Sequence, residues 1–325
     1  MTTTLWDTTG GDVVKALGAE GRAGGAVAAG LALTLIVIVD ERQVAAAEQA
    51  ATVAAQAHPC RLLIVVRRQL DTADRLDAEV QVGGRLGPTE AVVLRMYGRL
   101  TLHAESVVLP LLAPDAPVVT WWHGPPPDEI ATDPLGVLAD RRVTDCALAP
   151  DPGAALRQRA VDFAPGDTDL AWGRTTPWRA LLASAFDSRA LTPDAARVEA
   201  EAGNPSAALL AGWLGDRLSL TPGTEASAGP GVTDVEISCG REQVFRISRP
   251  DGRLATFSRT GQPDRQLPLP RRGLGELLAE EVRRLDADAV YAEALAATTG
   301  IAGLRDRSPA RTHRWQDPIM AGSDR

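Results

Sequence analysis

The chain has 325 residues, of which 45% are hydrophobic, so it can bury one large core or, as we expect, two domain cores. A formal net charge of −8 at pH 7 argues against nucleic acid as a partner, because an acidic surface repels phosphate unless basic residues gather on one face. The one lysine, Lys15, lies in a polar N-terminal stretch, which excludes a Walker A loop and Schiff-base chemistry.

The apolar run over residues 31–39 ends at charged residues and is too short to span a bilayer. The N-terminus has no basic region ahead of a cleavable apolar stretch, so we expect a cytoplasmic protein without a membrane partner. The cysteines Cys60, Cys146 and Cys239 form no CxxC pair, which argues against a structural zinc site or a dithiol. Their redox sensitivity stays open.

Strands and helices alternate in the first half of the chain. An apolar strand over 28–39, an alanine-rich helix over 41–58 and an aliphatic strand over 61–67 form a βαβ unit. The alternating segments 76–84 and 90–98 predict an antiparallel pair at a sheet edge. The remaining predicted elements are a helix over 102–113, a strand over 116–122, a short helix near Leu135, a strand over 141–148 and a helix over 152–163. This order predicts an α/β domain with a mixed, doubly wound sheet.

The second half has a different pattern, and residues 165–169 are predicted to be a hinge before it. Its predicted elements are a helical stretch over 170–188 broken near Pro177, a strand over 196–202, a helix over 204–220 capped by Asn204, three strands over 232–261 and helices over 274–285 and 288–298. The three strands alternate at period two and predict an antiparallel meander in an α+β domain. The predicted units are a flexible N-terminus over 1–24, an α/β domain over 25–163, an α+β domain over 164–299 and a disordered tail over 300–325.

Patterns that carry catalytic chemistry are weak in this sequence. The junction after the first strand reads VIVDERQ and lacks the glycine-rich turn of a dinucleotide site. His103 and Glu105 form an HxE pair without the PCxxC segment that zinc deaminases need. His123 is favoured as a surface-loop histidine, because no nucleophile elbow accompanies it. We therefore expect no catalytic residue, cofactor site or metal site.

Tryptophan, aspartate and arginine side chains supply the candidate contacts to a partner. For each tryptophan a core position is favoured, although at least one of the set is a candidate interface anchor. Asp167 and Asp169 could be paired carboxylates for acid/base or Mg²⁺ chemistry, but helix capping by Asp167 with Thr168 is favoured. The arginines near 261–272 fit either an anion, partner or effector contact or a solvated turn. The candidate partner-binding residues are Trp121, Trp122, His123, Asp167, Asp169, Trp172, Arg174, Trp178, Arg265, Arg271 and Arg272.

Two long segments carry a family resemblance, GRLTLHAESVVLPLLAPDAPVVTWWHG at 98–124 and APGDTDLAWGRTTPWRALLASAF at 164–186. With further matching segments across 25–297, they resemble the actinobacterial OpcA proteins, assembly and allosteric-activator proteins of glucose-6-phosphate dehydrogenase. The resemblance implies a non-catalytic protein that binds this dehydrogenase, favours its active oligomeric form and supports the oxidative pentose phosphate pathway and NADPH supply. The alternative is a sugar-phosphate or nucleotide sensor, or an enzyme, that uses the carboxyl edge of the α/β sheet.

Overall fold

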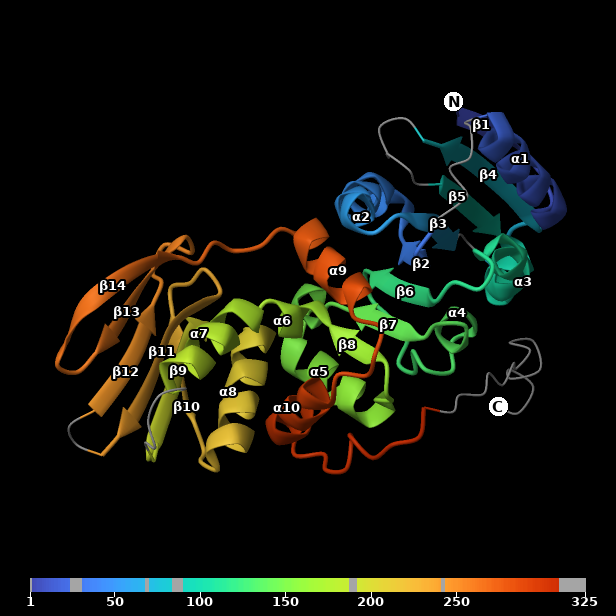
Figure 1. The fold of residues 1–325 in the computed structure, drawn as a ribbon. Coiled ribbons are helices and arrows are strands. Elements are labelled where there is room, and N and C mark those ends of the chain that lie inside the picture. The colour runs from blue at the N-terminus through green and yellow to red at the C-terminus, as the bar shows by residue number, and fades with distance from the viewer. Residues whose placement is uncertain are drawn as a thin grey trace, which may run out of the picture.

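A computed structural model describes residues 2–23, 31–67, 70–83, 90–186, 192–240 and 243–309. Figure 1 shows two sheets at opposite ends of the molecule, with helices between them. In the described part of the chain, no helix combines the length and the apolar character needed to cross a membrane.

The first sheet has eight strands in the order β1-β4-β5-β3-β2-β6-β7-β8. The strands are β1 (Thr2–Leu5), β2 (Leu33–Val39), β3 (Cys60–Arg67), β4 (Arg75–Val82), β5 (Glu90–Tyr97), β6 (Val118–His123), β7 (Arg141–Thr144) and β8 (Asp167–Asp169). Neighbours from β5 to β8 run parallel, whereas β4 is antiparallel to β5 and β1 is antiparallel to β4. The prediction of a mixed α/β sheet is confirmed.

Helices cover both faces of this sheet, as the continuous aliphatic strands indicate. The helical elements up to residue 162 are α1 (Gly10–Ala23), η1 (Glu41–Gln43), α2 (Val44–Ala57), η3 (Gly98–His103), α3 (Ala104–Val108), η4 (Leu109–Leu111), α4 (Pro134–Val137), η5 (Cys146–Leu148) and α5 (Pro152–Asp162). Leu35 and Val37 of β2 face a core that includes α2, and Ile36 between them faces a core that includes α1, α3 and α4. The two-residue period of the strand divides its side chains between the two cores.

The second sheet has six strands in the order β10-β9-β11-β12-β13-β14, and only the β9–β10 pair is parallel. The strands are β9 (Ala195–Glu201), β10 (Gly223–Ser227), β11 (Val232–Cys239), β12 (Gln243–Ser248), β13 (Leu254–Arg259) and β14 (Gln262–Pro268). The later helices are α6 (Leu170–Gly173), α7 (Thr176–Phe186), α8 (Pro205–Leu218), α9 (Leu274–Arg283) and α10 (Ala289–Thr299). The predicted meander is confirmed, and β14 extends it where a turn was expected.

The N-terminal segment is ordered, so the prediction of a flexible segment is wrong for residues 2–23. Strand β1 pairs with β4, and α1 places Val13 and Leu17 in the core. These two side chains lie four residues apart and therefore share one face of the helix. The β4–β5 pair consequently does not form the sheet edge, because β1 lies outside it.

The predicted hinge at 165–169 is also wrong. Residues 167–169 form β8, which is hydrogen-bonded in parallel to β7 of the first sheet. The predicted break near Pro177 is confirmed, because the helical stretch divides into α6 (Leu170–Gly173) and α7 (Thr176–Phe186), and Pro177 lies in the first turn of α7. Helix α9 then returns to the first sheet and packs beside α2 (Figure 1). The two halves of the chain therefore share a core.

The C-terminal segment up to residue 309 is packed against the helices, which corrects the predicted disordered tail over 300–309. Leu304 is 1% exposed in a core with α5 and α10. The Arg307 guanidinium donates to the carbonyl oxygens of Ala160, Val161 and Phe163 at the end of α5. These bonds satisfy carbonyls that a helix end leaves free. Residues 310–325 lie outside the described residues.

Candidate functional site

Polar side chains gather where the parallel strands β6, β7 and β8 end. His123 is the last residue of β6, Asp145 follows β7, and Asp169 ends β8. Parallel strands place their carboxyl ends at the same edge of a sheet, which is where ligands commonly bind in α/β folds. The chemistry of this edge depends on which of these groups are already paired.

The Asp169 carboxylate is fully buried and is held by donors from three segments. It accepts hydrogen bonds from Thr144 Oγ1 at 2.7 Å, Cys146 N at 3.0 Å and Ala171 N at 2.8 Å. Burial and the nearby charge of Asp145 raise the pKa of Asp169. The carboxylate thus ties β7 and β8 to the start of α6. Its bond to Ala171 caps this helix, a role that the sequence pattern predicted for Asp167.

Asp145 and Arg174 form a bidentate pair with two bonds of 2.7 Å. Burial opposes the charge of Arg174, but the hydrogen bonds to Asp145 and the charges of Asp145 and Asp169 together outweigh it and raise the pKa of the guanidinium. His123 is 6% exposed, so the prediction of a surface-loop histidine is wrong. Burial lowers the pKa of His123, against the opposing charge of Asp145, and its ring lies 4.8 Å from that of Trp121.

A cavity of about 350 Å³ opens beside this edge. Its lining includes Gly124, Pro125, Asp145, Cys146 and Arg159. Among the described residues, no group of three or more His, Cys, Asp or Glu side chains is placed to hold a metal ion.

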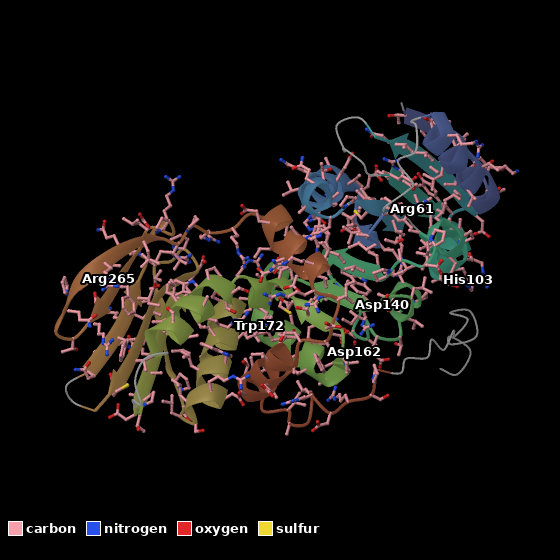
Figure 2. The ribbon with its side chains drawn as sticks, in the orientation of Figure 1. Arg61, His103, Asp140, Asp162, Trp172 and Arg265 are labelled. Atoms are coloured by element: carbon pink, nitrogen blue, oxygen red, sulfur yellow. The ribbon has the colours of Figure 1, made fainter. Side chains whose placement is uncertain are left out.

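The candidate tryptophans all lie in the interior. Trp121, Trp122, Trp172 and Trp178 are 0–2% exposed. Adjacent residues of a strand point to opposite faces, and Trp121 packs in the α2 core while Trp122 lies beside Gly136 of α4. Figure 2 shows Trp172 among the helices between the two sheets, where its indole donates to Asp288 at 2.8 Å. These indoles therefore pack in the cores, the position that the sequence favoured.

The remaining candidates divide into paired and unpaired side chains. Asp167 makes a buried ion pair with Arg142, and Arg272 pairs with Glu280 while donating to the Gly173 carbonyl. Arg265 and Arg271 are exposed and have no side-chain partner among the described residues. Figure 2 places Arg265 at the outer edge of the second sheet.

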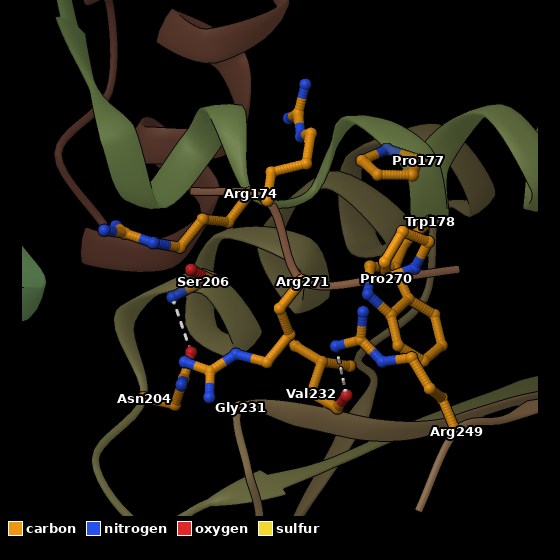
Figure 3. A pocket seen from close by; sticks show the side chains of 11 residues that line it. Arg174, Pro177, Trp178, Asn204, Ser206, Gly231, Val232, Arg249, Pro270 and Arg271 are labelled. Carbon is orange, nitrogen blue, oxygen red and sulfur yellow. Dashed lines mark hydrogen bonds between the residues drawn. The ribbon is translucent and has the colours of Figure 1, made fainter. Parts of the chain in front are cut away.

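Three of the arginines come together elsewhere, around a small cavity in the second half of the chain (Figure 3). Arg174, Arg271 and Arg272 line it together with Trp178. Arg249 also lines it, and sequence reasoning missed this residue because its burial depends on segments that are distant in the chain.

Comparison with known families covers both halves of this architecture. A model of the glucose-6-phosphate dehydrogenase subunit N-terminal domain matches residues 51–161, and one of the C-terminal domain of that subunit matches residues 165–295. The chain belongs to the OpcA family. A "Putative OxPP cycle protein OpcA" of Synechocystis sp. is 29% identical over 198 residues, which is 56% of this chain and 41% of the relative. The match thus spans about two fifths of the relative's length.

The predicted OpcA resemblance is confirmed at the level of the family, and the narrower actinobacterial grouping stays a prediction. The two OpcA matches meet between residues 161 and 165. His123 and Asp145 belong to the first match, whereas Asp169 and Arg174 belong to the second. The polar cluster at the sheet edge therefore joins the two OpcA units, while all residues that line the arginine-rich cavity belong to the second.

Proposed function

We propose that this chain is a non-catalytic subunit that binds glucose-6-phosphate dehydrogenase and favours its active oligomeric form. The observation that carries the proposal is the pair of family matches, which cover residues 51–161 and 165–295 and are both described as domains of a subunit of that enzyme. The similarity to an OxPP cycle protein supports a role in the oxidative pentose phosphate pathway and its NADPH supply.

The polar groups at the edge of the first sheet support a structural role for these residues. The Asp169 carboxylate accepts hydrogen bonds from three donors, and the Asp145 carboxylate accepts from both terminal nitrogens of Arg174. If either carboxylate gave up these bonds to act on a substrate, each buried group left unpaired would cost about 1–3 kcal/mol. The alternative, a sensor or enzyme, depends on the cavity of about 350 Å³ beside this edge.

Activation requires a difference in affinity between two forms of the dehydrogenase, since a partner shifts an equilibrium only by binding one form more tightly. A tenfold shift needs about 1.4 kcal/mol. A few arginine contacts supply a difference of this size. We place one of these contacts at Arg265, because its exposed guanidinium lies on β14, the open edge of the second sheet.

The test is co-purification with the dehydrogenase of the same organism, followed by its rate at low and at saturating glucose 6-phosphate. A stable complex with a lower apparent KM or a higher kcat is expected. If the dehydrogenase had the same rate with and without a saturating concentration of this protein, at every substrate concentration, the activator proposal would be refuted.

The contact surface is tested by Arg265→Glu, which should weaken the complex by about fivefold, or about 1 kcal/mol. Lys15→Glu is the matched control, because it makes the same charge change on α1 at the other end of the molecule (Figure 1). Equal affinities of both variants and the unchanged chain would place the contact surface away from β14.

A further inference from the structure

The arginine cavity lies between α7, α8 and the second sheet and has a volume of about 70 Å³. We define it by Arg174, Trp178, Ser206, Arg249, Arg271 and Arg272, which line it (Figure 3). None of the described residues that line it is acidic. A concave site with four guanidinium groups and no carboxylate of its own favours an anion.

Arg249 provides the most informative observation, because it is a buried charge without a carboxylate partner. Its side chain is 5% exposed, and its terminal nitrogens donate to the carbonyl oxygens of Leu269 at 3.0 Å and Val232 at 2.9 Å. Its Nε is buried and has no partner among the described atoms. The Trp178 ring lies 4.9 Å from the guanidinium carbon. Carbonyl dipoles and an aromatic face do not neutralise a buried charge, so the site lacks a counter-charge.

The other arginines differ in how their charge is balanced. Arg174 is paired with Asp145, and Arg272 is paired with Glu280. Arg271 has no acidic partner in the described part of the chain, and its Nε lies 3.8 Å from the position that a Cβ on Gly231 would occupy. Burial and the charge of Arg271 lower the pKa of Arg249 to about 10, against the weaker opposing effect of Asp251. Two positive charges, those of Arg249 and Arg271, therefore face the cavity uncompensated.

Helix α8 adds one side-chain donor, the Ser206 hydroxyl, and the field of its amino end at the same place. Its N-cap residue Asn204 accepts from the backbone amides of Ser206 at 2.9 Å and Ala207 at 3.1 Å (Figure 3). The Ser206 hydroxyl lines the cavity and makes no hydrogen bond with any described residue. The amino end of a helix of this length carries a partial positive charge, which adds to the field of the two arginines.

We propose that the arginine cavity binds the phosphate group of a small metabolite. A phosphate carries a charge of about −1.5 to −2 at pH 7, which matches the two uncompensated guanidinium groups better than a single carboxylate does. Its oxygens accept bonds from Arg249 Nε, Arg271 and the Ser206 hydroxyl. The cavity holds a phosphate-sized group, so the rest of a larger ligand would lie outside it. The site is independent of the dehydrogenase contact proposed above.

The test is isothermal titration of the chain alone with inorganic phosphate, glycerol 3-phosphate and acetate at constant ionic strength. Saturable binding of phosphate or its ester is expected, with acetate binding at least about tenfold more weakly. Tighter binding of glycerol 3-phosphate than of inorganic phosphate supports a metabolite as the ligand, whereas the reverse order shows that the ligand is free phosphate and overturns the metabolite assignment. Absence of saturable binding for both, or acetate binding as tight as phosphate, overturns the proposal.

Two matched variants locate the site. Arg271→Gln should weaken phosphate binding at least about tenfold without loss of fold, because its side chain is exposed and unpaired. Arg265→Gln makes the same charge change on β14 and should leave binding unchanged. A crystal soaked in tungstate should show an anomalous peak between Arg249 and Arg271. Equal weakening by both variants, or a peak elsewhere only, overturns the assignment.

Discussion

The ion pair between Arg141 and Glu281 joins the first sheet to α9, the helix that returns from the second half of the chain. Arg141 begins β7 and donates from Nη2 to Glu281 Oε2 at 2.5 Å and from Nη1 to the Asp286 carbonyl at 3.0 Å. Both side chains of the pair are buried, with exposed fractions of 2% and 6%. Replacing Arg141 by methionine would therefore leave the Glu281 carboxylate buried without its partner.

The magnitude follows from this burial. Removing one partner of a buried pair destabilises a protein by about 3–5 kcal/mol, whereas an exposed pair contributes about 0–1 kcal/mol. We expect Arg141→Met to lower the free energy of unfolding by about 3–5 kcal/mol, measured by urea denaturation at constant temperature. Arg305→Met is the matched control, because its pair with Glu293 leaves the Arg305 side chain 63% exposed.

The loss of stability caused by Arg141→Met should depend on pH. Burial raises the pKa of Glu281, and the charge of Arg141 opposes that rise. When the folded pKa lies above the unfolded one, the native state binds more protons between the two values, so stability falls as pH rises through that window. Without Arg141 the folded pKa rises further. The deficit of Arg141→Met relative to the unchanged chain should thus be larger at pH 8 than at pH 5.

A double variant separates lost charge pairing from lost packing. Arg141→Met with Glu281→Met removes both charges and should recover most of the stability, because apolar replacements of a buried pair are often neutral. A deficit below about 1 kcal/mol for the single variant, or the same deficit at pH 5 and pH 8, would refute the reasoning.

Three further predictions concern packing and accessibility. Gly212→Ala should cost about 1–3 kcal/mol in urea denaturation, because its Cβ would lie 2.6 Å from a backbone oxygen of α10, whereas Gly18→Ala in α1 meets only a flexible side chain at 3.5 Å and should be neutral or stabilising. Leu304→Ala should cost about 2–5 kcal/mol by the same assay, and no loss would show that the segment after α10 is not docked. Alkylation by iodoacetamide at pH 8 followed by mass spectrometry should modify the half-buried Cys239 first and the other cysteines only on unfolding, since burial raises the pKa of Cys60 to about 12.

Local sequence signals were sufficient to predict the elements whose own consecutive residues favour the observed secondary structure. The aliphatic run of β3, the alanine-rich α2 and the Asn204–Pro205 start of α8 are each visible in a short window. Their apolar period, composition or capping residue is a property of consecutive residues, which is why these elements were predicted close to their observed bounds.

Elements that depend on pairing with distant segments were missed. Strand β8 reads Asp167-Thr168-Asp169 and has no apolar side chain, yet all three residues are buried because they pair with β7 and bond to Arg142 and Thr144. Strand β14 is polar and extended because β13 supplies its hydrogen bonds. A short stretch of sequence does not show which distant strand will pair with it.

The sequence by itself determined the family, the α/β class of the first half and the meander of the second, because these follow from long ordered motifs and from residue periodicity. It also drew attention to Arg271 and Arg272 as a possible anion contact, one of two alternatives it left open. Only the tertiary structure decided that Asp145 and Glu280 neutralise Arg174 and Arg272, while Arg249 and Arg271 remain unbalanced. The physical reason is that burial and charge compensation depend on which distant segments come together, and neighbouring residues in the chain do not fix either one.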